Sequence, residues 1–198
     1  MKRREALRRT AILAGSTTLT PTLFSLLQSC QSQPGLNWQP VFLDEDQARF
    51  VSLMVDTWLP KTDTPGALDM KVDMFIDQVF AKVYDPEGQS YVVSEMDKFN
   101  GQCKEKFGDK FIDLSEEDRM AMMKLAESES GKFNPGVWGT AVGEQKPVGF
   151  YRSLKSMAMW GYFTSEDIGK NVLNYDPIPG VYKGCIPLSD VGNSWSLG

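Results

Sequence analysis

The stretch DEDQARFVSLMVDTWLP, residues 44–60, decides the fold class because it has the features of an amphipathic helix. Asp44 precedes Glu45 and Asp46, and the positive end of a helix dipole favours acidic residues in the first turn. The apolar residues recur at the three- and four-residue spacing of one buried face: Val51, Met54, Val55 and Trp58. Pro60 ends the pattern. The stretch predicts a helix from Asp44 that needs other helices to cover its apolar face.

Further segments with helical spacing follow, and turn signals separate them. The expected elements are a turn at residues 61–66, a helix from Ala67 that stops at residues 85–88, a helix from Ser90 to about Phe107, a helix after a capping box at residues 115–118, a looser stretch at residues 129–147, a helix from about Val148 to Tyr162, and a short turn after a second capping box at residues 164–167. No convincing run of alternating Val and Ile appears. The fold class is therefore all-α, a compact irregular helical bundle of about five to six helices with an irregular Pro/Gly-rich C-terminal tail.

Large side chains at helical spacing are expected to fill the core. The aromatic members of this set are Trp58, Phe75, Phe80, Trp160 and Phe163, and the methionines are Met120, Met122 and Met123. The alternatives are a cofactor contact for the aromatic residues and a deformable partner-binding face for the methionines. Asp63, which Thr62 and Thr64 flank, fits a turn better than a ligand cluster.

After Asn174 the helical pattern fails, because the tail is rich in proline and glycine. The tail nevertheless carries many apolar residues, and such a segment needs a surface to lie on. That surface could belong to its own bundle or to another protein. The residues expected to dock on a partner are Tyr175, Pro177, Ile178, Pro179, Tyr182, Cys185 and Ile186.

The first thirty residues have the layout of an export signal. Arg3 and Arg4 head a basic segment before a moderately apolar core, which resembles the twin-arginine pattern of a route for folded proteins. Residues 27–30 resemble a lipobox, so we expect cleavage before Cys30, lipid attachment to Cys30, and a periplasmic protein anchored to the membrane. The alternative is an incidental Cys30, with the leader cut elsewhere or kept as an anchor. The expected divisions are a signal peptide at 1–29, a linker at 30–43, a helical domain at 44–190 and a tail at 191–198.

The amino-acid composition excludes several classes of function. Removing residues 1–29 takes away five basic residues and one acid, which leaves 16 basic and 25 acidic residues and changes the net charge from −5 to −9. An acidic chain argues against nucleic acid as a partner, because phosphate binding needs clustered Lys and Arg. The sequence contains no histidine. Ser-His-Asp hydrolysis, Cys-His chemistry, most zinc sites and Cys-x-x-Cys-His haem attachment are thereby excluded.

The three cysteines leave several pairings open. If Cys30 carries lipid, Cys103 and Cys185 could bridge each other in an oxidising compartment, one could bridge a partner, or a thiol could stay free. Two cysteines alone do not have the spacing of a metal site. We therefore expect no metal, catalytic or cofactor-binding residues in this chain.

Two stretches resemble the gluconate 2-dehydrogenase subunit 3 family. Residues 56–67, DTWLPKTDTPGA, are similar to a helix end and turn of that family. Residues 161–169, GYFTSEDIG, followed by YDPIPG at 175–180 and GCIP at 184–187, resemble its C-terminal signature. The resemblance covers roughly residues 44–190. The charged Lys61 and the stretch at 129–147 depart from the family's pattern.

The resemblance implies a non-catalytic small subunit of a periplasmic or membrane-associated sugar or sugar-acid dehydrogenase. In such complexes a large, GMC-type subunit carries FAD and performs the oxidation, a third subunit can carry haem c, and the small subunit supplies the export signal. The alternatives are a free-standing envelope lipoprotein that acts as a binding module, and an enzyme that uses paired carboxylates on a sugar. No carboxylate pair stands out from the solvated helical faces.

Overall fold

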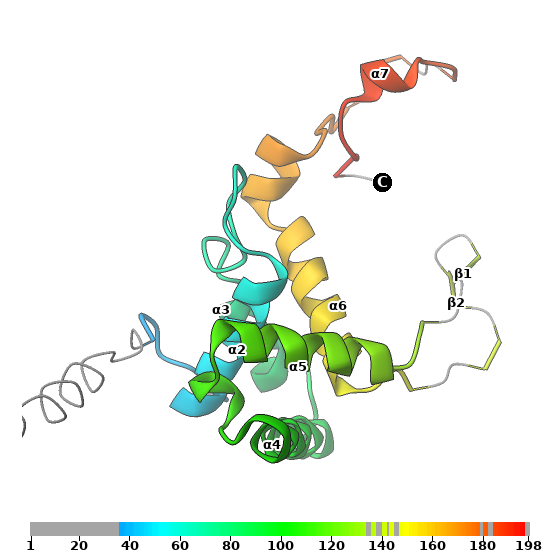
Figure 1. Ribbon diagram of the computed structural model, residues 1–198. Coiled ribbons are helices and arrows are strands. Elements are labelled where there is room, and N and C mark those ends of the chain that lie inside the picture. Colours follow the sequence, from blue (N-terminus) through cyan, green and yellow to red (C-terminus); the bar gives the residue numbers. More distant parts are fainter. Residues whose placement is uncertain are drawn as a thin grey trace, which may run out of the picture. The chain divides into compact units, whose positions relative to one another are not determined.

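The computed structural model describes residues 36–133, 136–137, 140–141, 143–144, 147–178, 180–181 and 184–196 (Figure 1). The chain divides into two units, Met1–Asn37 and Trp38–Gly198, and the fold below is that of the second unit. Arg3, Arg4 and Cys30 lie outside the described residues, so the export signal and the lipidation stay predictions.

The first helix of the second unit, α2, spans Glu45–Trp58, and Asp44 caps it as the sequence indicates. The Asp44 carboxylate accepts a hydrogen bond from the Gln47 backbone N–H at 2.8 Å, and the Asp44 N–H donates to Gln47 Oε1 at 3.1 Å. This reciprocal pair satisfies two backbone donors that a helix start leaves open. The residues that α2 buries are Ala48, Phe50, Val51, Met54 and Val55.

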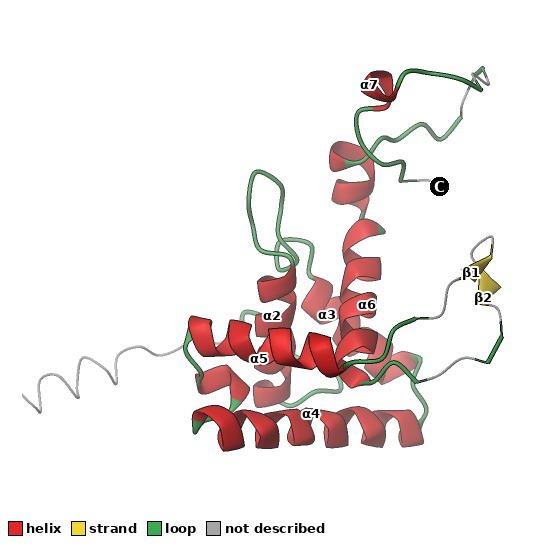
Figure 2. Ribbon diagram, turned by 45° about the vertical axis from the view of Figure 1, so that its right-hand side comes forward, coloured by secondary structure: helices red, strands yellow, loops and turns green. Residues whose placement is uncertain are grey.

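The remaining elements confirm the all-α class. They are the helices α3 (Val72–Lys82), α4 (Pro86–Phe107), α5 (Glu116–Glu129), α6 (Phe150–Phe163) and α7 (Leu188–Val191), the short 3-10 turn η1 (Phe111–Asp113), the π-helical turn η2 (Ile168–Val172), and the two-residue strands β1 (Gly136–Val137) and β2 (Thr140–Ala141). The strands pair antiparallel within the looser stretch at 129–147. Helices α2, α3 and α6 contact one another, and α5 packs against α6 (Figures 1 and 2).

Three expected boundaries were wrong, each for a local reason. The helix expected from Ser90 begins at Pro86, because the Asp85 carboxylate accepts from the Gly88 N–H at 2.8 Å and caps α4, with Pro86 in the first turn. Residues 67–71 form turns, and Lys71 has a left-handed φ of 55° just before α3 begins. The second capping box does not form, because Thr164 Oγ1 donates back to the Trp160 carbonyl at 2.7 Å.

The core centres on three aromatic rings from different elements. Phe50 of α2, Phe99 of α4 and Phe111 of η1 meet edge to face, with ring centroids 5.1 to 5.5 Å apart. Edge-to-face geometry places the positive ring edge on the negative ring face, which adds to the gain from burial. The expected core residues Phe80, Met122 and Met123 are buried, whereas Met120 is exposed. These contacts fix α2 and α4 around one aromatic centre.

The segment before α2 belongs to the folded unit, which begins at Trp38 instead of Asp44. Two buried carboxylates of α3 hold it. Asp77 is fully buried and accepts hydrogen bonds from the backbone N–H groups of Val41, Phe42 and Leu43 at 2.7, 3.1 and 2.9 Å. The second carboxylate, Asp73, accepts from Trp38 Nε1, Ser52 Oγ and the Met74 N–H. Each buried charge thus has several donors, which offsets the free-energy cost of removing it from water.

Candidate docking surface

Two segments that are far apart in the sequence meet at the turn after α2. Tyr162, near the end of α6, is buried and donates from its hydroxyl to the Pro65 carbonyl at 2.7 Å. Trp58, the last residue of α2, donates from Nε1 to Tyr151 Oη near the start of α6 at 3.0 Å. A Cβ on Gly66 would lie 2.7 Å from the Lys61 backbone nitrogen, so the turn requires glycine there. These contacts attach the turn firmly to α6.

The crossing of α3 and α6 exposes an aromatic pair. A Cβ on Gly161 would lie 2.7 Å from a ring carbon of Phe75, so this glycine lets α6 approach α3 closely. The Trp160 ring packs on the Phe75 ring with centroids 5.5 Å apart, yet 61% of Trp160 remains exposed. Phe163 is also exposed. The core role expected for Trp160 and Phe163 was therefore wrong, and both residues contribute to the surface.

After η2 the chain forms a closed loop, residues 174–196, which we name the docking loop. Its two ends pair through a parallel bridge between Asn174 and Trp195. The Asn174 N–H donates to the Ser194 carbonyl at 2.9 Å, and the Ser196 N–H donates to the Asn174 carbonyl at 3.0 Å. Helix α7 lies within the loop (Figure 2). The loop is thus closed by its own backbone.

The docking loop leaves its large apolar side chains in water. Ile178, Val181 and Leu188 are 83%, 75% and 87% exposed, and Trp195 is also exposed. Among the residues expected to dock, Tyr175, Pro177, Ile178, Cys185 and Ile186 are exposed, whereas Pro179 and Tyr182 lie outside the described residues. The described part of the tail therefore does not bury its apolar side chains on its own bundle. Of the two surfaces left open by the sequence, that of another protein fits better.

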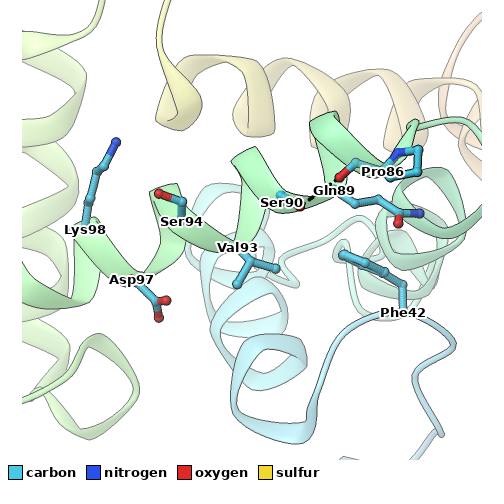
Figure 3. Close-up of a pocket in the computed structure, with 8 residues that line it drawn as sticks. All are labelled: Phe42, Pro86, Gln89, Ser90, Val93, Ser94, Asp97 and Lys98. Carbon is cyan, nitrogen blue, oxygen red and sulfur yellow. Dashed lines mark hydrogen bonds between the residues drawn. The ribbon is translucent and has the colours of Figure 1, made fainter.

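An open groove of about 800 Å³ lies along the outer side of α4 (Figure 3). Phe42 comes from the segment before α2, and α4 supplies the other lining residues, among them Pro86, Gln89 and Val93. The Gln89 amide already donates to the Phe80 carbonyl at 2.9 Å. The groove thus combines the apolar surface of Phe42, Pro86 and Val93 with polar residues of α4. The remaining polar lining residues are Ser90, Ser94, Asp97 and Lys98.

The two described cysteines lie in different environments, and both thiols are free in this structure. Cys103 is fully buried in α4, and burial raises the pKa of its thiol to about 11. Cys185 lies exposed in the docking loop. Of the alternatives left open by the sequence, a bond between the two cysteines is not formed in this structure, and a bond from Cys185 to a partner stays untested.

The described part of the chain does not gather the ligands of a metal site. No group of three or more His, Cys, Asp or Glu side chains suited to a metal ion occurs among those residues. The buried carboxylates Asp73 and Asp77 are occupied by the donors that hold residues 38–43. Among the described helices, none has the length and apolar character needed to span a bilayer.

Sequence reasoning missed three features of this surface. Nothing in the sequence indicated that Trp160 is exposed, because its position in the helical repeat is that of a core residue. The sequence also contained no signal that Asn174 closes the loop, because its partners lie about twenty residues downstream. Asp73 and Asp77 did carry a signal: both are acids on α3 among the apolar residues Val72, Ile76 and Phe80. Acids at such positions need buried donors.

Comparison with protein-family models matches residues 45–180 to the family described as gluconate 2-dehydrogenase subunit 3. No curated protein and no solved structure matches the chain. The match runs from the start of α2 into the docking loop and includes the turn that Tyr162 holds. It covers well over half of the sequence. The chain therefore belongs to the gluconate 2-dehydrogenase subunit 3 family.

Proposed function

We propose that this protein is the non-catalytic small subunit of a periplasmic or membrane-associated, flavin-dependent sugar or sugar-acid dehydrogenase. The family is, by its description, a subunit of a dehydrogenase complex. The observation that carries the proposal is the docking loop, whose exposed apolar side chains have the character of an interface core. In this proposal the loop and the Trp160–Phe75 pair contact a large, GMC-type subunit that binds FAD.

The chemistry supports a division of labour between the subunits. Oxidation of an alcohol by a flavin needs a base that takes the hydroxyl proton while hydride leaves the carbon. The flavin supplies the hydride acceptor, and histidine is the usual base near neutral pH. This chain has no histidine. In the proposal, FAD and the base reside in the large subunit, and haem c, where a third subunit exists, receives the electrons.

The small subunit then acts in export and stabilisation. A flavoprotein that acquires FAD in the cytoplasm must cross the membrane folded, and the twin-arginine pattern at Arg3 and Arg4 is typical of that route. A large subunit without a leader would cross together with this chain. Lipid on Cys30 would then retain the pair at the membrane, and a single site with several acyl chains suffices for stable anchoring.

The test is co-expression with the FAD-dependent, GMC-type dehydrogenase of the same organism that the proposal assigns as the large subunit. With the unchanged chain, flavoenzyme activity should appear in the periplasmic or membrane fraction. With Arg3→Lys and Arg4→Lys combined, the activity should stay in the cytoplasm while total activity and complex formation persist. Changing Lys2 and Arg9 to Gln serves as the control for lost basic charge. Normal export with the double-lysine variant would refute the escort role.

The groove beside Phe42 favours a second candidate, a free-standing envelope lipoprotein that binds a ligand or another envelope protein. This candidate predicts that the chain purifies from its native host as a stable monomer. Co-purification in a fixed ratio with a flavoprotein rejects it.

A further inference from the structure

We propose that Asn174 and Asn193 form a latch that holds the docking loop in the conformation that binds the flavoprotein subunit. The inference rests on the proposed function and deepens it, because it assigns positioning residues to the docking step. Neither asparagine is expected to touch the partner. Asn193 and the other distal members of the latch lie beyond residue 180, where the family match ends.

The latch is a dense set of hydrogen bonds around one side-chain amide. Asn174 Nδ2 donates to the carbonyl oxygens of Val191 and Asn193, the latter at 2.6 Å. Asn193 Nδ2 donates in return to the Val172 carbonyl at 2.7 Å, and Asn193 Oδ1 accepts from the Ser194 N–H at 2.8 Å. Among uncharged side-chain groups, only the amide offers two donors and an acceptor. Neither asparagine can therefore be replaced by another uncharged group with the same hydrogen bonds.

The latch matters because the rest of the loop has little to hold it. The described residues between its ends are exposed apart from the half-buried Val191, and the large apolar ones among them do not bury themselves on the bundle. A loop of this kind samples many conformations unless its ends are joined, and a partner would have to order it on binding. Closing the ends beforehand removes part of that cost. If the loop adopts its binding conformation only part of the time, the apparent dissociation constant of the complex equals the intrinsic one divided by the fraction of molecules in that conformation.

The composition of the loop indicates a protein as its occupant. Family membership makes the chain a subunit, so it has neighbouring subunits in a complex. Anionic lipid is a poor alternative, because the loop carries two acids, Asp176 and Asp190, against one base, Lys183, and removal of residues 1–29 would leave a net charge of −9. Trp195 stands exposed at the latch itself, and tryptophan is enriched at the energetic centres of protein interfaces. The latch thus presents a Trp and several aliphatic side chains to an apolar protein surface.

The experiment measures binding of the full chain to the co-expressed FAD-dependent dehydrogenase of the same organism that the proposal assigns as the large subunit. Asn174→Asp and Asn193→Asp keep the side-chain shape but remove the latch donors. We expect each to weaken binding about tenfold, as a competent fraction of about one tenth would do. The matched control is Asn171→Asp, which changes an exposed asparagine whose side-chain amide donates to Asp167 within its own helical turn. Ile178→Asp, which alters the contact surface directly, serves as the reference for lost docking.

Two further readouts separate a latch from general damage. The thermal midpoint of the bundle should stay unchanged in both latch variants, because the loop lies outside the core. The Ser196 N–H donates to the Asn174 carbonyl, and hydrogen exchange at this N–H should become faster in both latch variants. In a chain that already carries Ile178→Asp, adding Asn174→Asp should lower the affinity much less than Asn174→Asp does in the unchanged chain. The reason is that the latch holds the loop for a contact that Ile178→Asp has already removed.

Each result decides one part of the argument. If Ile178→Asp weakens binding and the latch variants do not, the latch is refuted and the docking loop stands. If none of the three weakens a complex that forms normally, both latch and docking loop are refuted and the subunit role stands on another surface. If the loop variants change binding to vesicles of phosphatidylcholine and phosphatidylglycerol instead, a lipid surface is the occupant. If the unchanged chain forms no complex, the proposed function itself fails.

Discussion

Tyr162 donates its hydroxyl hydrogen to the carbonyl oxygen of Pro65 at 2.7 Å, although 97 positions separate the two residues. This bond joins the turn after α2 to the end of α6, and α6 leads through η2 into the docking loop. The two stretches that carry the family resemblance are therefore one structural unit. The turn supports the helix end from which the exposed surface begins.

Tyr162→Phe removes this bond without changing the shape of the ring. The Pro65 carbonyl loses a buried donor, so we expect the free energy of unfolding to fall by about 1 kcal/mol. For a domain of this size, that corresponds to a thermal midpoint lower by about 2–4 °C. Thermal denaturation followed by circular dichroism measures it, with Tyr91→Phe at an exposed position as the control. Equal midpoints for the two variants would show that the bond does not hold the turn.

Asp77→Ala tests the attachment of residues 38–43 to α3. Three backbone N–H groups lose their shared acceptor, and we expect a loss of about 3 kcal/mol in the free energy of unfolding. Asp77→Asn keeps one acceptor oxygen and should cost less. Asp97→Ala, at an exposed acid of α4, provides the matched control. Limited proteolysis should cut near residue 40 in Asp77→Ala before the bundle unfolds, and resistance there would contradict the clamp.

Trp160→Ala should separate binding from stability. Because Trp160 is mostly exposed, its removal should change the free energy of unfolding by less than about 1 kcal/mol, whereas Phe80→Ala in the core should cost about 3–5 kcal/mol. Affinity for the flavoprotein subunit should fall in Trp160→Ala at full stability. Urea denaturation and a binding titration on the same samples supply both numbers. A large loss in the free energy of unfolding of Trp160→Ala would show that Trp160 packs as a core residue.

The thiols should differ sharply in reactivity. The pKa of Cys103 is about 11, so almost none of it is thiolate at neutral pH, and burial blocks access as well. In a Cys30→Ser background, a thiol-specific disulfide reagent should modify Cys185 at least about a hundredfold faster than Cys103. In denaturant the two rates should converge. Fast modification of both thiols in the native state would show that α4 opens readily.

Glu127 gives the pH dependence of one ion-pair cluster. The Lys155 ammonium, with Arg152 nearby, holds the pKa of Glu127 below its ordinary value of 4.5. A carboxyl whose pKa is lower in the folded state stabilises the fold above the unfolded value, and that contribution is lost as the pH falls through the folded value. Glu127→Gln should therefore be less stable at neutral pH, by under about 1 kcal/mol because the cluster is partly exposed. Urea denaturation at neutral pH and well below pH 4.5 checks that the difference disappears in acid.

Local chemistry explains what the sequence predicted correctly. The apolar spacing of Val51, Met54 and Val55 and the cap at Asp44 depend only on residues within one helix, so they appear directly in the chain. The family segments and the all-α class were identified for the same reason. The turn at residues 61–66 also follows from local signals, because Pro65 and Gly66 set its backbone.

Long-range geometry decided the rest. Trp160 has the spacing of a core residue, but the close crossing at Gly161 and Phe75 turns its ring outward, and no spacing rule contains that crossing. The partners of Asp77 and Asn174 lie far along the chain, so their roles appear only when distant backbone groups come within hydrogen-bond distance. The sequence determined the segments that form α2 to α6 and the family they belong to, but not the short α7 in the tail. Only the tertiary structure decided which side chains face water, because burial depends on how helices meet and not on any one of them.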